Sequence, residues 1–130
     1  MTTSEQPRIR LWELIEEGAF GLIAFHRPDG AIGAHITWID RWENCLALNT
    51  DTRRFKYRML QRTRTATVCV FIPDHPYEYF EVSCAVDDEI LGDAAVAHLH
   101  SLSIRHRGIP YDGDLTHRVV VLLRPLRARG

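Results

Sequence analysis

The sequence predicts one mainly β domain of the α+β class, in which six antiparallel strands form a closed barrel and short helices lie between them. Two features favour this fold class. Six short runs of apolar and β-branched residues alternate with polar turns, and most of these turns have the length of a hairpin connection. No internal repeat, linker or low-complexity segment divides the chain, so all 130 residues are assigned to a single domain, 1–130.

A short amphipathic helix and an antiparallel meander are expected in the first part of the chain. The helical pattern has apolar residues on one face and acids on the other, and Gly18 follows it in the place of a helix C-cap. The first two apolar runs flank a turn in which Pro28 presets φ and Gly30 accepts a positive φ. The expected ranges are a helix over 9–17, strands over 19–25 and 31–39, a polar turn over 40–44 and a third strand over 45–48.

A second helix, a second hairpin, a third helix and a closing strand are expected in the rest of the chain. Phe55, Met59 and Leu60 have helical spacing. Aromatic and β-branched residues flank the turn 73–76, and the last apolar run is expected to stop before Pro125. The expected ranges are helices over 53–62 and 94–104 and strands over 65–72, 77–86 and 117–123.

The basic residues are gathered in one segment, although the net charge of the chain is only −1. Half of the residues from 53 to 64 are basic, whereas the segment 87–93 is acidic. Any anion-binding surface should therefore involve the basic segment. Because the rest of the chain is not basic and shows no recognition motif for DNA or RNA, no nucleic-acid partner is expected.

Other features bear on compartment and metal binding. The N-terminus is polar and no apolar run has the length of a membrane span, so we expect a soluble, cytoplasmic protein with no membrane partner. Cys45, Cys69 and Cys84 are odd in number and form no C-x-x-C pair, which predicts free thiols. His98 and His100 are close in sequence but would point apart on a helix, so no metal site is expected.

The segment 49–58 combines a strand end, a hydroxyl-rich turn and the start of a helix. Thr52 is a candidate N-cap, and Arg53, Arg54 and Lys56 follow it in the first turn. The helix macrodipole disfavours cations there, so an anion is expected nearby. Backbone N–H groups, threonine hydroxyls and guanidinium groups together suit a phosphate. The alternative is that these side chains form an ordinary solvated helix face.

Several stretches between Leu11 and Arg129 match the pattern of one protein family. They are Ala66-Thr67-Val68-Cys69-Val70, the run from Pro73 to Val82, Trp38, Ile104-Arg105-His106-Arg107-Gly108 with Pro110-Tyr111, and His117-Arg118-Val119-Val120-Val121 with Arg124-Pro125. In these stretches and their order the sequence resembles the pyridoxamine 5'-phosphate oxidase-like split β-barrels. The resemblance is strongest to the subgroup that uses flavin mononucleotide (FMN) or the deazaflavin coenzyme F420.

The resemblance implies a cofactor groove that a second subunit completes, and hence a homodimer. It implies that the cofactor phosphate is held at the strand end and the helix start, and that the ring system lies along the second strand. The residues implied are Thr50, Thr52, Arg53, Arg54 and Lys56 for the phosphate, and His35, Ile36, Thr37 and Trp38 for the ring.

The activity implied by the resemblance is that of a flavoprotein oxidoreductase. Hydride would pass between bound F420 or FMN and an unidentified small substrate. The cofactor carries this chemistry, so no catalytic residue is assigned. Two alternatives stay open at this point: a cofactor-binding or storage protein without turnover, and a haem-binding protein of the same fold.

Overall fold

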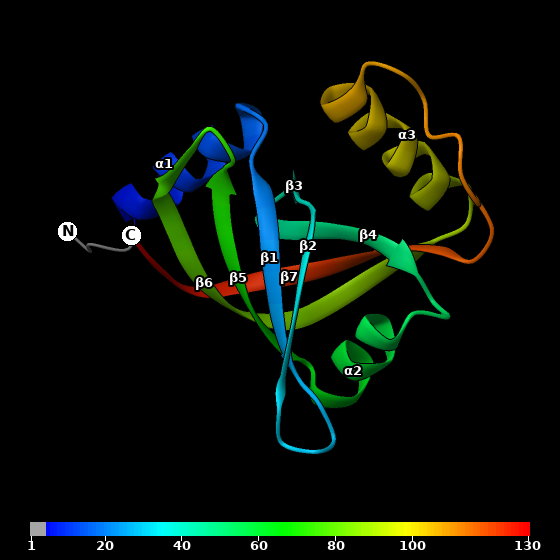
Figure 1. Cartoon of the computed structure of the whole chain (residues 1–130), viewed down its shortest axis with the longest axis horizontal. Helices are drawn as coiled ribbons and strands as arrows, with labels where there is room; N and C mark the ends of the chain where they lie inside the picture. The colour runs from blue at the N-terminus through cyan, green and yellow to red at the C-terminus, as the bar shows by residue number, and fades with distance from the viewer. Residues whose placement is uncertain (1–4) are drawn as a thin grey trace.

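The computed structural model describes residues 5–130, and this part of the chain forms three helices and seven strands (Figure 1). The elements are α1 (Glu5–Glu16), β1 (Phe20–His26), β2 (Ile32–Trp38), β3 (Asp40–Trp42), β4 (Cys45–Asp51), α2 (Phe55–Thr63), β5 (Thr65–Ile72), β6 (His75–Leu91), α3 (Asp93–Arg107) and β7 (Arg118–Arg129). Their order agrees with the prediction from sequence except for one additional strand, β3.

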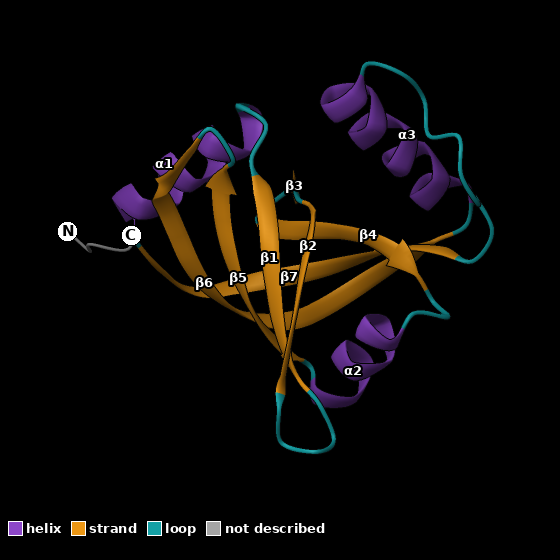
Figure 2. Cartoon of the chain, viewed as in Figure 1, coloured by secondary structure: helices purple, strands orange, loops and turns teal. Residues whose placement is uncertain are grey.

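The seven strands belong to one antiparallel sheet in the order β2-β1-β5-β6-β7-β4-β3 (Figure 2). The prediction of six strands is corrected at the segment 40–44, for which the sequence predicts a turn. Asp40 to Trp42 pairs with Cys45 to Ala47, and the turn itself is only Glu43 and Asn44. Glu43 has a φ of 54°, and a positive φ of this kind allows a two-residue hairpin turn.

The sheet is curled but open, which corrects the expectation of a closed barrel. Its edges are β2 and β3, and no pairing joins these two strands in the described part of the chain. They are separated in sequence by Ile39 alone, so the sheet must curl until its two edges meet at this residue. Ile39 is fully buried, and a Cβ added at Gly21 would lie only 3.2 Å from the Ile39 Cβ. Glycine at position 21 therefore leaves room for the junction.

One apolar core fills the inside of the curled sheet. Alternate residues of the strands point inward, among them Ile23, Val68 and Val82. Leu11 of α1 and Leu60 of α2 join the same core. Figure 1 shows α1 and α2 at opposite ends of the long strands. None of the described helices is long and apolar enough to cross a membrane.

The outer face of the sheet is covered in one region and exposed in another. Over β4 and β7 it is covered by α3, whose Ala95 packs with Ala47 and Val120. By contrast, large apolar side chains of β2 and β7 lie open: Ile32 is 57% exposed and Leu126 is 53% exposed. The exposed region of the outer face thus carries large apolar side chains.

The last strand runs beyond the point at which the sequence predicts its end. Pro125 was expected to stop it, because proline has no N–H to donate to a neighbouring strand. In the structure Pro125 lies opposite Cys84, where the pairing of β6 with β7 shifts register next to Ser83. This irregularity accommodates the proline, and β7 continues to Arg129. The three cysteines are free thiols, as predicted.

Gly33 offers a test of the packing between β1 and β2. It lies opposite Phe25, and a Cβ at this position would lie 2.4 Å from the ring of that residue. We expect Gly33→Ala to lower the free energy of unfolding by about 1–3 kcal/mol, because the buried ring must move. Chemical denaturation measures the change. The same substitution should cost less in a Phe25→Leu background, and equal costs in both backgrounds would contradict this packing.

Candidate functional site

A groove lies between β2 and α3 and ends at the start of α2. One part is a pocket of about 260 Å³, with Ile36, Thr37 and Trp38 of β2 on one side and Leu99 and Leu102 of α3 among its other lining residues. Its remaining lining residues include two polar ones, Asn49 and Arg118, and the ring of Tyr111. This part of the groove is mainly apolar.

The second part of the groove is charged. It has a volume of about 310 Å³ and shares Tyr111 and Arg118 with the apolar pocket. Asp51, Arg53, Arg54 and Asp114 complete its lining. Since the two pockets share two side chains, one elongated ligand can occupy both, with an apolar end and an anionic end.

The turn before α2 is organised by Asp51. Its carboxylate accepts hydrogen bonds from the backbone N–H of Arg53 at 2.7 Å and from the Arg53 guanidinium at 2.6 Å. These bonds hold the pKa of Asp51 down, at about 2. Arg53 also pairs with Asp114 at 2.8 Å. Its charge is therefore balanced by two carboxylates of the same molecule.

The predicted N-cap is wrong, because the turn uses Asp51 in place of a threonine hydroxyl. The helix begins at Phe55 with Arg54 in the N-cap position and no side-chain cap. The backbone N–H of Thr52 donates to the carbonyl of His117 at 2.9 Å. Thr52 thus joins the turn to the start of β7.

Lys56 and Arg54 lie at the same helix start and have no balancing acid. Lys56 is only 8% exposed, and burial, followed by repulsion from Arg54 and Arg118, lowers its pKa to about 8. No ion pair in the described part of the chain involves any of these three residues. His35 belongs to the same positive region, since burial, Lys56 and Arg54 all lower its pKa. We call Arg54, Lys56 and Arg118 the cation cluster.

Arg118 is a site residue that the sequence analysis missed. Its Nε and NH2 groups donate to the Asn49 side-chain oxygen at 3.1 and 2.8 Å. Its guanidinium also lies 5.7 Å from the centre of the Tyr111 ring. Tyr111 is held in place by its backbone N–H, which donates to His100 Nδ1 at 3.1 Å. The available signal was an arginine directly before the apolar run of the closing strand, in a stretch that carries the family resemblance.

The structure brings together only part of the predicted site. Three of the predicted ring contacts line the apolar pocket, and Trp38 stacks on His106 with the ring centres 5.2 Å apart. His35 lies on the opposite face of β2, against Phe25. Thr50 is buried on the same face of β4 as Leu48. Thr52, in the turn that follows β4, lines another hollow beside α3, and Arg118 lines this hollow too.

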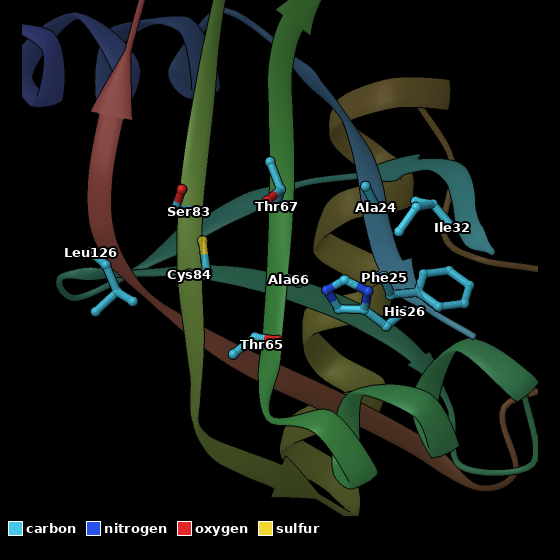
Figure 3. Close-up of a pocket in the computed structure, with 10 residues that line it drawn as sticks. All are labelled: Ala24, Phe25, His26, Ile32, Thr65, Ala66, Thr67, Ser83, Cys84 and Leu126. Atoms are coloured by element: carbon cyan, nitrogen blue, oxygen red, sulfur yellow. The ribbon is translucent and has the colours of Figure 1, made fainter. Parts of the chain in front are cut away.

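A further pocket of about 300 Å³ lies on the outer face of β1, β5 and β6 (Figure 3). Thr67, Ser83 and Leu126 line it, and His26 is its one titratable nitrogen base. It is lined by no member of the cation cluster, so it is not a candidate for binding an anion. No three His, Cys, Asp or Glu side chains within residues 5–130 form a group that could hold a metal ion.

Comparison with known proteins gives matches among solved structures. No family model matches the chain, and no curated protein matches it. A structure described as an F420 reductase is 29% identical, with a TM-score of 0.78, over 90% of this chain and 94% of that one. A putative pyridoxamine 5'-phosphate oxidase from Listeria innocua is 12% identical, with a TM-score of 0.69, over 94% of this chain and 95% of that one.

A third structure is a pyridoxamine 5'-phosphate oxidase-related, FMN-binding protein from Nostoc punctiforme PCC 73102. It is 16% identical, with a TM-score of 0.67, over 98% of this chain and 84% of that one. The two matches of lower identity show the fold, and the F420 reductase match adds similarity in sequence. Together they confirm the predicted resemblance: the chain has the fold of the pyridoxamine 5'-phosphate oxidase-like split β-barrels.

Proposed function

We propose that this chain binds F420 or FMN in the groove between β2 and α3 and acts as an oxidoreductase on a small substrate. The observation that carries the proposal is the cation cluster at one end of an apolar pocket. Arg54, Lys56 and Arg118 repel one another, and none of them forms an ion pair in the described part of the chain; Asp51 and Asp114 attract Arg118 only from beyond ion-pair distance. An arrangement of this kind is stabilised when an anion binds between the cations.

The phosphate end of either cofactor suits this cluster. Arg54 and Lys56 stand at the N-terminus of α2, where the helix dipole repels them and attracts an anion. Arg54 is exposed and lines the charged pocket, whereas Lys56 is buried and adds positive charge close to it. Arg53 contributes to the shape of the turn, because two carboxylates already hold its guanidinium.

The ring end suits the apolar pocket. Ile36 and Trp38 on β2 face Leu99 and Leu102 on α3, which leaves an apolar space next to the cations. When bound, a flavin or deazaflavin supplies the hydride chemistry, and the protein orients it. The side chains of the pocket exclude water from one side of the ring. No acid or base of the chain is required for a hydride step.

We further propose that the protein is a homodimer. The apolar pocket, of about 260 Å³, is small for a complete cofactor site, and Ile36 in its wall is 64% exposed. Ile32 and Leu126 extend the exposed apolar surface on the same outer face. A second copy seated there would bury this surface and supply the missing wall of the groove.

The comparisons support a flavin-type cofactor in general. One similar structure is described as an F420 reductase and another as an FMN-binding protein. Both cofactors present a ring and a phosphate, so the groove accounts for either. A protein that binds one of them and exchanges no hydride would correspond to the storage alternative.

Charge removal at the helix start tests the binding proposal. We expect the double variant Arg54→Ala, Lys56→Ala to bind FMN and F420 at least about tenfold more weakly, because charge-assisted hydrogen bonds are lost. Fluorescence titration of each cofactor measures the change. Arg62→Ala is the matched control, since it removes one charge from the other end of α2. Unchanged affinities in the double variant would make this segment ordinary surface.

The lowered pKa of Lys56 predicts a pH dependence of anion binding. Sulfate, whose charge is constant near neutrality, should bind more weakly as pH rises through about 8, because Lys56 loses its proton. Calorimetric titration at several pH values measures this. Lys56→Arg should remove most of the loss, since arginine stays charged. An equal loss in both proteins would contradict the assignment.

The same shift predicts a change in stability with pH. The folded pKa lies near 8 and the unfolded one near 10.5, so the unfolded state holds more protons between these values. This lysine therefore makes the free energy of unfolding rise with pH across that window. The parent protein should show the rise relative to Lys56→Met in urea denaturation. If the free energy of unfolding changed with pH in the same way in both proteins, the buried position of the Lys56 ammonium group would be contradicted.

The homodimer is tested on the outer face. The double variant Ile32→Glu, Leu126→Glu should run at monomer mass in light scattering at micromolar concentration, because buried carboxylates oppose association. Ile104→Glu is the control, since Ile104 is similarly exposed but lies on α3. A parent protein at monomer mass would overturn the proposal.

A further inference from the structure

A buried chain of polar side chains lies behind the groove and ends at Arg118. Asn49 and His98 are 8% and 7% exposed. The Asn49 side-chain nitrogen lies 2.8 Å from the carbonyl oxygen of Ala95 and 3.1 Å from His98 Nδ1. On its other side, His98 Nε2 lies 3.0 Å from the Asp40 carboxylate. Asp40 is held in turn by Arg105 of α3 at 3.0 Å.

The direction of every bond in this chain follows from the donors. A guanidinium can only donate, so the Asn49 oxygen must face Arg118 and the Asn49 nitrogen must face His98. The amide nitrogen also only donates, so His98 Nδ1 must accept. The ring proton is then on Nε2 and is donated to Asp40. The two ends of the chain fix the same orientation of the amide and one neutral form of the imidazole.

We propose that Asn49 is a positioning residue that holds the Arg118 guanidinium toward the ligand, and that His98 and Asp40 lock Asn49 in the required orientation. This inference rests on the proposed function of the groove. Asn49 uses two of the five N–H groups of the guanidinium. Arg118 lines the apolar pocket, the charged pocket and the hollow beside Thr52, so the remaining groups are available to a ligand there.

A neutral anchor preserves the charge that the ligand needs. Arg53 and Arg118 line the same pocket, but only Arg53 is bound by carboxylates. An acid in place of Asn49 would hold Arg118 equally well and would cancel its charge. The amide holds the guanidinium without neutralising it, and Arg118 stays half-buried and positive. The interaction therefore fixes geometry and leaves the electrostatic attraction to the anion.

A double-mutant cycle with sulfate as the probe tests this role. Arg118→Ala and Asn49→Ala should each lower sulfate affinity by about tenfold, and the double variant should lose no more than Arg118→Ala alone. Asn49→Asp should also lose affinity, because it neutralises the arginine while keeping its anchor. An Asn49→Ala loss of the same size in the Arg118→Ala background would show a general structural effect and overturn the proposal. Calorimetry measures the affinities of the parent protein and of all four variants.

A second measurement needs no ligand, and it remains informative if Arg118→Ala or Asn49→Ala fails to fold. In ¹⁵N-labelled parent protein, NMR should show His98 as the neutral form with its proton on Nε2, and a slowly exchanging Arg118 Nε–H. Asp40→Asn should disturb both signals. A proton on Nδ1, or an Arg118 signal that does not respond to Asp40→Asn, would overturn the positioning chain. A correct NMR result without sulfate, FMN or F420 binding would instead refute the proposed function.

Discussion

The antiparallel register between β4 and β7 places Asp51 opposite Arg118 and Asn49 opposite Val120. These pairs join residues about seventy positions apart in sequence, and the whole groove depends on them. Since successive side chains of a strand point to opposite faces, Asn49, Asp51 and Arg118 all reach the side of the sheet that α3 covers. A slip of one residue would turn Arg118 into the core and bring Val119 into the groove. Burial of the valines on the inner face prevents this slip.

Two arginines of the groove differ in their role because their partners differ. Arg53 lies between Asp51 and Asp114, and this pairing fastens the turn before α2 to the loop before β7. Arg118 is bonded to an amide and forms no ion pair in the described part of the chain. The first interaction gives the site its shape, whereas the second leaves it a net positive charge. A count of basic residues in the sequence cannot separate these roles, since it does not show where the acids lie.

Local patterns predicted the elements well, and the errors come from contacts that apolar periodicity does not show. The helix expected over 53–62 begins later, at Phe55, because the Asp51 side chain organises the preceding turn. The segment 40–44 reads as polar turn, yet its first residues gain a strand partner in β4. The strand expected to end at Leu123 continues, because an irregularity of β6 accommodates Pro125. The first two corrections depend on neighbours only a few residues away, and the third depends on a strand about forty residues away.

The candidate site, like the fold, could be predicted from the sequence only in part. Arg54 and Lys56 were identified because they are close in sequence to a helix start, where an isolated charge pattern is informative. Arg118 was missed, since its importance comes from Asn49, His98 and Asp40, which lie on three other elements. The buried Thr50 was included by analogy with the family, and no local pattern indicated that its strand position faces the core.

The single-residue junction at Ile39 has a mechanical consequence. Ile36 and Trp38 form part of the outer surface at one end of β2, and Asp40 follows Ile39 directly. Because Ile39 is locked in the core, β2 and Asp40 cannot shift independently of each other. A single buried residue therefore joins the ligand-facing end of β2 to the carboxylate that bonds to His98, so the wall of the groove and the support of Asn49 share one fixed point.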